Sequence, residues 1–185
     1  MGIFQDFEDE FGPPENCLSI TDDVFLMYES LLPAELIAQW RQVGLCSYGR
    51  GLLWFADPRQ FEGVIDEWIE GDDVSKPIVF LRTAFAHLYF WHKGSVFSLD
   101  VHRGSVSEVT PRISRIFSLL CDPEIKEKIL RASLFENALK ELGPIDRDEC
   151  YGFEPAIAVG GPGTLETLRR VKIREQLGIL AQLLH

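Results

Sequence analysis

The stretch DECYGFEPAIAVGG, residues 148–161, combines a cysteine, carboxylates and a glycine pair, which are residue types that active sites use. A nucleophilic Cys150 would need a partner histidine and a lowered thiol pKa. The neighbouring Asp148, Glu149 and Glu154 would instead repel a thiolate and raise that pKa. The glycines continue as GGPGTLE, which lacks the Lys-Ser/Thr of a phosphate-binding loop. We therefore predict a packed strand and a glycine turn here, and no catalytic cysteine.

Asp100 and His102 are a second candidate pair, because residues two apart on a strand lie on one face of the sheet. The pair is incomplete as a metal site, since protein metal sites use more ligands than two. Neither a Gly-x-Ser-x-Gly elbow nor a His-Glu-x-x-His motif occurs, and no carboxylate pair stands out among many. We expect no catalytic residues, no metal and no cofactor. Two alternatives stay open: a small-ligand or regulatory module binding at Asp100 and His102, and a hydrolase using Cys150 or Asp100.

Composition and charge indicate a soluble globular class of protein and a basic protein as the kind of partner that it would attract. The chain has 185 residues, of which 46% are hydrophobic, enough for a substantial core. It lacks an apolar run of the ~18 residues that a membrane span needs, and its N-terminus is acidic, unlike a secretory signal. We therefore expect a cytoplasmic protein without a membrane partner. The net charge of −11 would repel nucleic-acid phosphates and attract a basic protein.

The cysteines Cys17, Cys46, Cys121 and Cys150 are scattered and form no Cys-x-x-Cys pair. This spacing argues against a zinc knuckle or a redox pair. For a cytoplasmic protein we expect reduced, mostly buried thiols.

Two helices are predicted from the residues at their ends. The first begins at Pro33, which fits a first helical turn, and stops before Gly44. The second covers 57–71, with Asp57 as its cap and Pro58 directly after the cap. Apolar residues at helical spacing mark the buried face of each helix. These are Leu36, Ile37, Trp40 and Val43 in the first helix, and Phe61, Val64, Ile65, Trp68 and Ile69 in the second.

Acidic residues occupy the opposite side of the 57–71 helix. Docking its apolar face on the core is worth on the order of 10 kcal/mol before entropy, so the acidic side must face water. Like charges at helical spacing cost a few tenths of a kcal/mol each, and a basic partner would relieve that cost. A solvated face that binds nothing explains the same pattern. We predict that this face binds the partner through Glu62, Asp66, Glu70 and Asp73, with Glu67 and Asp72 beside them.

The remaining pattern predicts an α+β fold. Residues 76–110 form a β-meander with turns at Lys93-Gly94 and Arg103-Gly104, and its sheet should have one core face and one more polar face. Helical patterns dominate from Thr110 onward. We expect a largely antiparallel sheet flanked by helices, with a helical C-terminal portion. An α+β region over 1–112 and a mostly helical region over 113–185 should pack together as one globular unit.

Four segments carry a family resemblance: LPAELIAQWRQVGLCSYGRGLLWFADP, FLRTAFAHLYFW, VFSLDVHRGSVSEV and LGPIDRDECYGFEPAIAVGG. Together they resemble the bacterial GAD-like proteins over nearly the whole chain. The two-part arrangement is similar to immunity proteins of type VI secretion systems, which are partners of a secreted DNase toxin. A weaker similarity links the chain to the SUKH group of immunity proteins. The resemblance implies binding and neutralisation of a cognate toxin with a basic nuclease domain, and it implies no catalytic residues.

Overall fold

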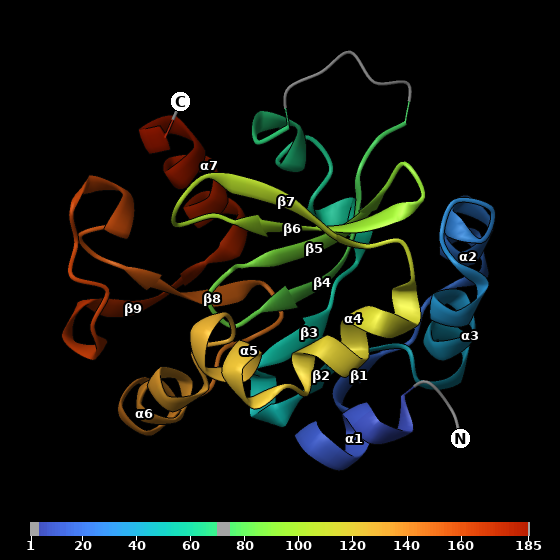
Figure 1. Cartoon of the computed structure of the whole chain (residues 1–185), viewed down its shortest axis with the longest axis horizontal. Helices are drawn as coiled ribbons and strands as arrows, with labels where there is room; N and C mark the ends of the chain where they lie inside the picture. Colours follow the sequence, from blue (N-terminus) through green and yellow to red (C-terminus); the bar gives the residue numbers. More distant parts are fainter. Residues whose placement is uncertain (1–3, 70–74, 185) are drawn as a thin grey trace.

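The computed structural model describes residues 4–69 and 75–184, and its centre is a seven-stranded antiparallel sheet. The strands lie side by side in chain order (Figure 1). They are β1 (Glu15–Leu18), β2 (Leu45–Tyr48), β3 (Leu53–Phe55), β4 (Ile78–Thr83), β5 (Leu88–His92), β6 (Ser95–Asp100) and β7 (Ser105–Thr110). Lys93 and Gly94 both have positive φ and make the tight turn between β5 and β6. The predicted meander is confirmed, and the sheet extends further back, to β1.

The other elements complete the predicted α+β fold. A separate two-stranded sheet contains β8 (Glu149–Phe153) and β9 (Leu168–Lys172). The helices are α1 (Gln5–Phe11), α2 (Asp22–Tyr28), α3 (Ala34–Val43), α4 (Ile113–Leu120), α5 (Pro123–Lys128), α6 (Ala132–Leu142) and α7 (Ile173–Leu184). The helical C-terminal portion is thus confirmed as α4 to α7. None of the helices in the described residues is both long enough and apolar enough to cross a membrane.

Helix α3 begins and ends where the sequence predicts. Pro33 directly precedes it, and Gly44 ends it with a φ of 81°. A Cβ on Gly44 would lie 2.4 Å from the carbonyl oxygen of Leu18, so this position needs glycine for space as well as for conformation. Leu36 and Trp40 are buried, as their spacing predicts.

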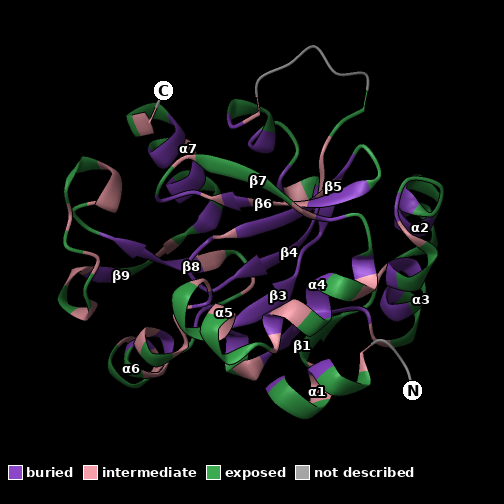
Figure 2. Ribbon diagram, viewed as in Figure 1, coloured by how far each residue is buried: buried purple, intermediate pink, exposed green. Residues whose placement is uncertain are grey.

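Both faces of the central strands, β2 to β6, are packed, so the prediction of a more polar face is wrong for them, whereas the edge strands β1 and β7 are mostly exposed. Tyr89 and Val96 belong to a core shared with α1, α3 and α4, whereas Phe90 and Leu99 belong to a second core, shared with residues 57–69 and α7. Figure 2 shows the central strands buried, the edge strand β7 mostly exposed, and the outer surfaces of the helices exposed. The alternation in β6 alone suggested a polar face. Neighbouring β4 and β5 are apolar on both faces, and elements distant in sequence cover them.

The predicted helix over 57–71 is wrong for its described part, 57–69. This segment is a series of tight turns, with 3-10 turns at Pro58–Gln60 and Ile65–Glu67. Gly63 has a φ of 78°, in the left-handed region, which interrupts a right-handed helix. Its conformational freedom therefore outweighed the helical spacing of the apolar residues.

Burial in this segment nevertheless follows the prediction. The Asp57 side chain accepts a hydrogen bond from the Arg59 amide at 3.1 Å, so it caps the first turn. The predicted apolar residues point inward: Phe61, Val64, Ile65 and Trp68 are buried, and Ile69 is partly buried.

The prediction of four reduced thiols is also wrong, because Cys17 and Cys46 form a disulfide. The two are 29 residues apart in sequence, and the pairing of β1 with β2 brings them together. Sequence spacing does not reveal such a pair until the strand neighbours are known. Cys121 and Cys150 are free.

Candidate functional site

Cys150 is an interior residue of β8. It is 0% exposed and belongs to the core beneath residues 57–69 and α7. Burial raises the pKa of the Cys150 thiol to about 12, because it outweighs the opposite effect of the nearby Arg82 guanidinium. The thiol therefore stays protonated at neutral pH and is not an activated nucleophile. The predicted strand is confirmed as β8, and the predicted glycine turn by Gly160, which has a φ of 88°. Gly161 is tightly packed in this turn, since a Cβ there would lie 2.1 Å from the Pro155 carbonyl oxygen.

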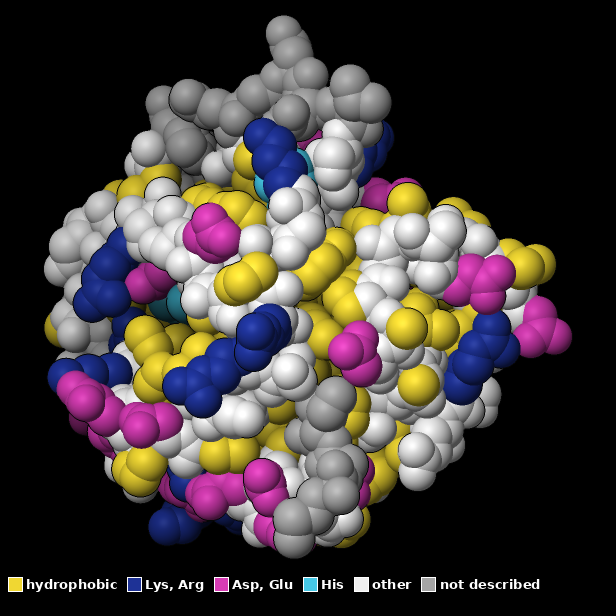
Figure 3. All heavy atoms as spheres, turned by 45° about the vertical axis from the view of Figure 1, so that its right-hand side comes forward, with side chains coloured by type: hydrophobic (Ala, Val, Ile, Leu, Met, Phe, Trp, Pro, Cys, Tyr) yellow, Lys and Arg dark blue, Asp and Glu magenta, His cyan; other side chains and the backbone are white. Residues whose placement is uncertain are grey.

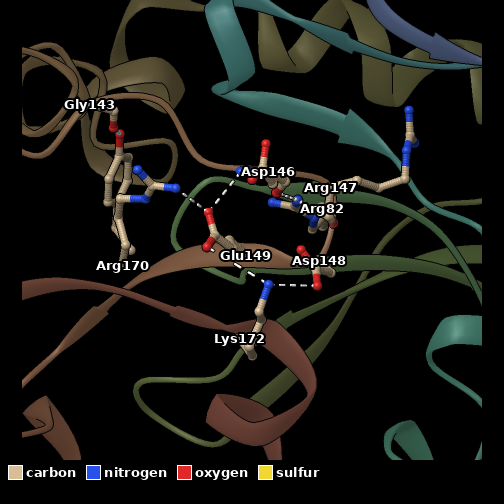
Figure 4. Close-up of polar contacts among 9 residues, drawn as sticks. Arg82, Gly143, Asp146, Arg147, Asp148, Glu149, Arg170 and Lys172 are labelled. Atoms are coloured by element: carbon tan, nitrogen blue, oxygen red, sulfur yellow. Dashed lines mark hydrogen bonds and ion pairs between the residues drawn. The ribbon is translucent and has the colours of Figure 1, made fainter.

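The carboxylates around β8 are paired with basic groups (Figure 4). Glu149 accepts hydrogen bonds from the Asp146 amide at 3.0 Å and from Arg170 at 2.7 Å, and these contacts lower its pKa. Asp148 pairs with Lys172 at 2.7 Å, and that hydrogen bond lowers the Asp148 pKa. Each carboxylate is held in its ionised form, which suits a structural ion pair and not a general acid.

Arg82 is the buried centre of this network. Its guanidinium donates to the carbonyl oxygens of Thr83 at 3.3 Å, Asp146 at 3.3 Å and Arg147 at 2.8 Å. It also lies 4.9 Å from the centre of the Trp54 ring. Burial lowers the Arg82 pKa to about 10, which still leaves the group charged at neutral pH. The side chain holds the segment before β8 against the large sheet.

Arg147 extends the network to the first two strands. It donates to the carbonyl oxygens of Asn16 and, at 2.8 Å, Leu45, next to the disulfide between Cys17 and Cys46. We call these residues the β8 network (Figure 4): Arg82, Arg147, Asp148, Glu149, Arg170 and Lys172. Through Arg147 the β8 network joins the C-terminal sheet to β1 and β2.

Asp100 and His102 do lie together, at the end of β6. Asp100 accepts hydrogen bonds from the His102 amide at 3.0 Å and from Arg103 at 3.0 Å. The His102 ring is buried and lies 3.0 Å from the Phe85 carbonyl oxygen, and burial lowers its pKa to about 4. The adjoining cavity has a volume of only about 10 Å³, room for at most one water molecule. The geometry does not favour the small-ligand alternative, which stays a prediction.

Metal binding finds no support in the geometry of the described part of the chain. No three His, Cys, Asp or Glu side chains lie close enough there to hold an ion together.

A larger groove, of about 690 Å³, lies between α2, the turns of residues 57–69 and the β5–β6 hairpin. This volume is in the range of binding pockets in proteins. The lining residues are Met27, Tyr28, Ser30, Leu31, Pro58, Glu62, Gly63, Ile65, Asp66, Ser75, Lys76, Pro77, Ile78, Trp91, His92, Lys93 and Gly94. Figure 3 shows this side of the molecule, where hydrophobic side chains gather with few acidic groups among them. The groove is therefore a candidate binding site.

Two predicted partner-binding residues, Glu62 and Asp66, lie in the groove wall and are exposed. Glu62 accepts a hydrogen bond from the Tyr28 hydroxyl at 3.0 Å. Burial and the Glu62 carboxylate both raise the Tyr28 pKa, so the hydroxyl remains a donor. Within the described part of the chain, neither carboxylate forms an ion pair.

Of the other predicted acidic residues, Glu67 alone lies in the described part of the chain. Glu67 is exposed but does not line the groove. Glu70, Asp72 and Asp73 lie outside the described residues. The role of the acidic row in binding a partner stays a prediction.

Sequence reasoning missed the apolar side of the groove. Leu26, Met27 and Leu31 are 69%, 51% and 54% exposed, on and just after α2. The run VFLMYESLL, residues 24–32, holds more apolar residues than one face of a short helix can bury. This excess of apolar residues could have predicted an exposed apolar surface at this helix.

Comparisons with known proteins agree with this architecture. Residues 2–104 match the GAD-like domain, and residues 112–184 match the C-terminal domain of the type VI secretion system (T6SS) immunity protein Tdi1. The crystal structure of Atu4351 from Agrobacterium tumefaciens is similar in fold, with a TM-score of 0.79 and 20% identity over 97% of this chain and 88% of that one. No curated protein matches the sequence. The chain therefore belongs to the GAD-like family, and its C-terminal part is similar to the C-terminal domain of the T6SS immunity protein Tdi1.

Proposed function

We propose that this protein protects the cell that makes it by binding and neutralising a cognate T6SS toxin, and that the toxin is a DNase. The observation that carries the proposal is the match of residues 112–184 to the C-terminal domain of the T6SS immunity protein Tdi1, directly after a GAD-like domain over residues 2–104. A DNase acts where the chromosome lies, so the complex forms in the cytoplasm. The protein itself catalyses no reaction in this proposal.

The charge of the molecule supports a nuclease as the partner. A DNase binds phosphates and therefore carries a basic active face. The net charge of −11 on this chain attracts such a face and accelerates the encounter. Glu62 and Asp66 are the members of the predicted acidic row that line the groove among the described residues. The groove, with these two carboxylates, is the proposed binding surface.

The two parts of the chain, 1–112 and 113–185, are proposed to act as one rigid unit. Phe7 of α1 and Phe117 of α4 pack at 5.3 Å between ring centres, within one shared core. A preformed surface of this kind loses little conformational entropy on binding.

Co-expression tests the proposal. The product of the adjacent gene is tested as the candidate toxin: it is expressed in a bacterium that lacks both genes, with and without this protein. We expect growth and intact chromosomal DNA only when the protein is present, and a stable complex on size-exclusion chromatography. Toxicity that persists despite a soluble, folded protein would refute the proposal, whereas protection from a toxin that leaves DNA intact would refute only its DNase part.

A further inference from the structure

The groove has an apolar floor and one acidic wall. We propose that it receives a segment of the toxin that inserts apolar side chains and places one lysine or arginine against Glu62 and Asp66. This inference rests on the proposed function and adds the location and the chemistry of the contact.

The apolar surface reaches beyond the cavity, which favours a protein segment as the occupant. Ile65, Ile78 and Trp91 line the groove, and Met27 and Leu31 form its edge on the α2 side. Leu26, outside the groove on the same helix, is also largely exposed. An exposed apolar patch of this extent at a cavity is typical of a protein interface, where apolar anchors enter a pocket and a wider surface excludes water around them.

The carboxylates identify the charge of the occupant. Glu62 and Asp66 lie in one wall without a basic partner among the described residues, and the hydroxyl of Tyr28 holds Glu62 at 3.0 Å. The lining also includes two exposed lysines, Lys76 and Lys93, away from this wall in sequence. An inserted basic side chain would therefore be drawn to the acidic wall and repelled by the lysines, and this asymmetry sets the orientation of the segment.

The same charges argue against other occupants. A second copy of this chain would bring another net charge of −11 to the surface. A nucleic-acid strand would bring phosphates to the two carboxylates. A basic toxin avoids both kinds of repulsion.

The first experiment reverses the acidic wall. The double variant Glu62→Lys/Asp66→Lys is compared with Glu67→Lys, which changes a neighbouring exposed carboxylate outside the groove lining. Binding to the purified toxin, inactivated in its catalytic site, is measured by surface plasmon resonance at two salt concentrations. We expect about 100-fold weaker binding for the double variant and less than about 3-fold for the control. Near-equal effects of the two variants would overturn the inference.

The second experiment tests the apolar edge. Leu31→Asp is compared with Ile179→Asp on α7, because both side chains are 54% exposed and only Leu31 lines the groove. Exposed positions tolerate a polar residue, so both variants should keep the wild-type thermal midpoint. We expect about 10-fold or greater loss of toxin binding for Leu31→Asp only. Full binding by a folded Leu31→Asp would overturn the inference even if the double charge variant fails to fold.

A third measurement identifies the occupant directly. A photo-crosslinking amino acid replaces Leu31 or, as the control, Ile179, and the toxin peptide attached to it is sequenced by mass spectrometry. The inference predicts a peptide with a lysine or arginine among apolar residues, captured from Leu31 and not from Ile179. A crosslink to a small molecule or to an acidic peptide would overturn it.

If the toxin is bound and neutralised yet all groove variants bind normally, the proposed function stands and this inference fails. If the wild-type protein does not bind the toxin, both fail.

Discussion

The β8 network and the groove both contain carboxylates, but they differ in whether those carboxylates have partners. Around β8, Glu149 and Asp148 are held by Arg170 and Lys172. In the groove, Glu62 and Asp66 have no basic partner among the described residues, and apolar side chains lie exposed beside them. The stretch that looked most like an active site is thus internally satisfied. The difference teaches that residue types indicate possible chemistry, whereas unsatisfied groups indicate where a partner binds.

Removal of Arg82 should have the largest effect on stability. Arg82→Met removes three hydrogen bonds to backbone carbonyls and the contact with Trp54. The carbonyl oxygens of Thr83 and Asp146 keep a backbone donor, whereas that of Arg147 loses its side-chain donor. We expect a loss of about 3–5 kcal/mol in the free energy of unfolding. Urea denaturation measures this, and the folded fraction should still bind toxin. If Arg82→Met is as stable as the wild type but no longer binds toxin, then the β8 network acts in binding, and the distinction between a stabilising β8 network and a partner-binding groove is wrong.

Loss of the disulfide beside this network should have the next largest effect. Cys17→Ser opens a crosslink between residues 29 apart in sequence, and we expect a loss of about 3 kcal/mol. Thiol titration of the unfolded, unreduced wild-type protein should find only Cys121 and Cys150 free. Four reactive thiols in that assay would show that the crosslink does not form in the purified protein.

Acid should weaken the fold through the buried imidazole of His102, near β8. Burial lowers its pKa to about 4, from an unfolded value near 6.5, so the unfolded chain binds the proton more readily. The stabilisation is complete above pH 6.5 and is lost as the pH falls towards 4, about 1.4 kcal/mol per pH unit at most. Urea midpoints at several pH values should show a shallower dependence in His102→Gln. An identical slope in both proteins would mean that His102 does not titrate differently on folding.

The surface ion pair of the network should have the smallest effect. Lys172 is exposed and pairs with Asp148, and such pairs add little to stability. We expect Lys172→Met to leave both the urea midpoint and toxin binding unchanged. A clear loss of toxin binding would show that the interface includes β8, and that the β8 network does not differ from the groove in this respect.

Local features of the sequence determined much of this protein. Pro33 and Gly44 mark the two ends of α3. Alternating residues and the Lys93-Gly94 turn form the meander, and the spacing of Phe61 and Trp68 predicts their burial. These features depend on backbone preference and on the hydrophobic effect, which act over a few residues. The family resemblance, confirmed by the comparisons, likewise came from the sequence.

Only the tertiary structure decided the rest. Strand pairing brought Cys17 to Cys46. The groove needed α2, the 57–69 turns and the β5–β6 hairpin to meet in space, which no spacing in the sequence encodes. Whether a carboxylate is paired or left for a partner depends on neighbours from distant segments, and for that physical reason only the fold separates the β8 network from the groove.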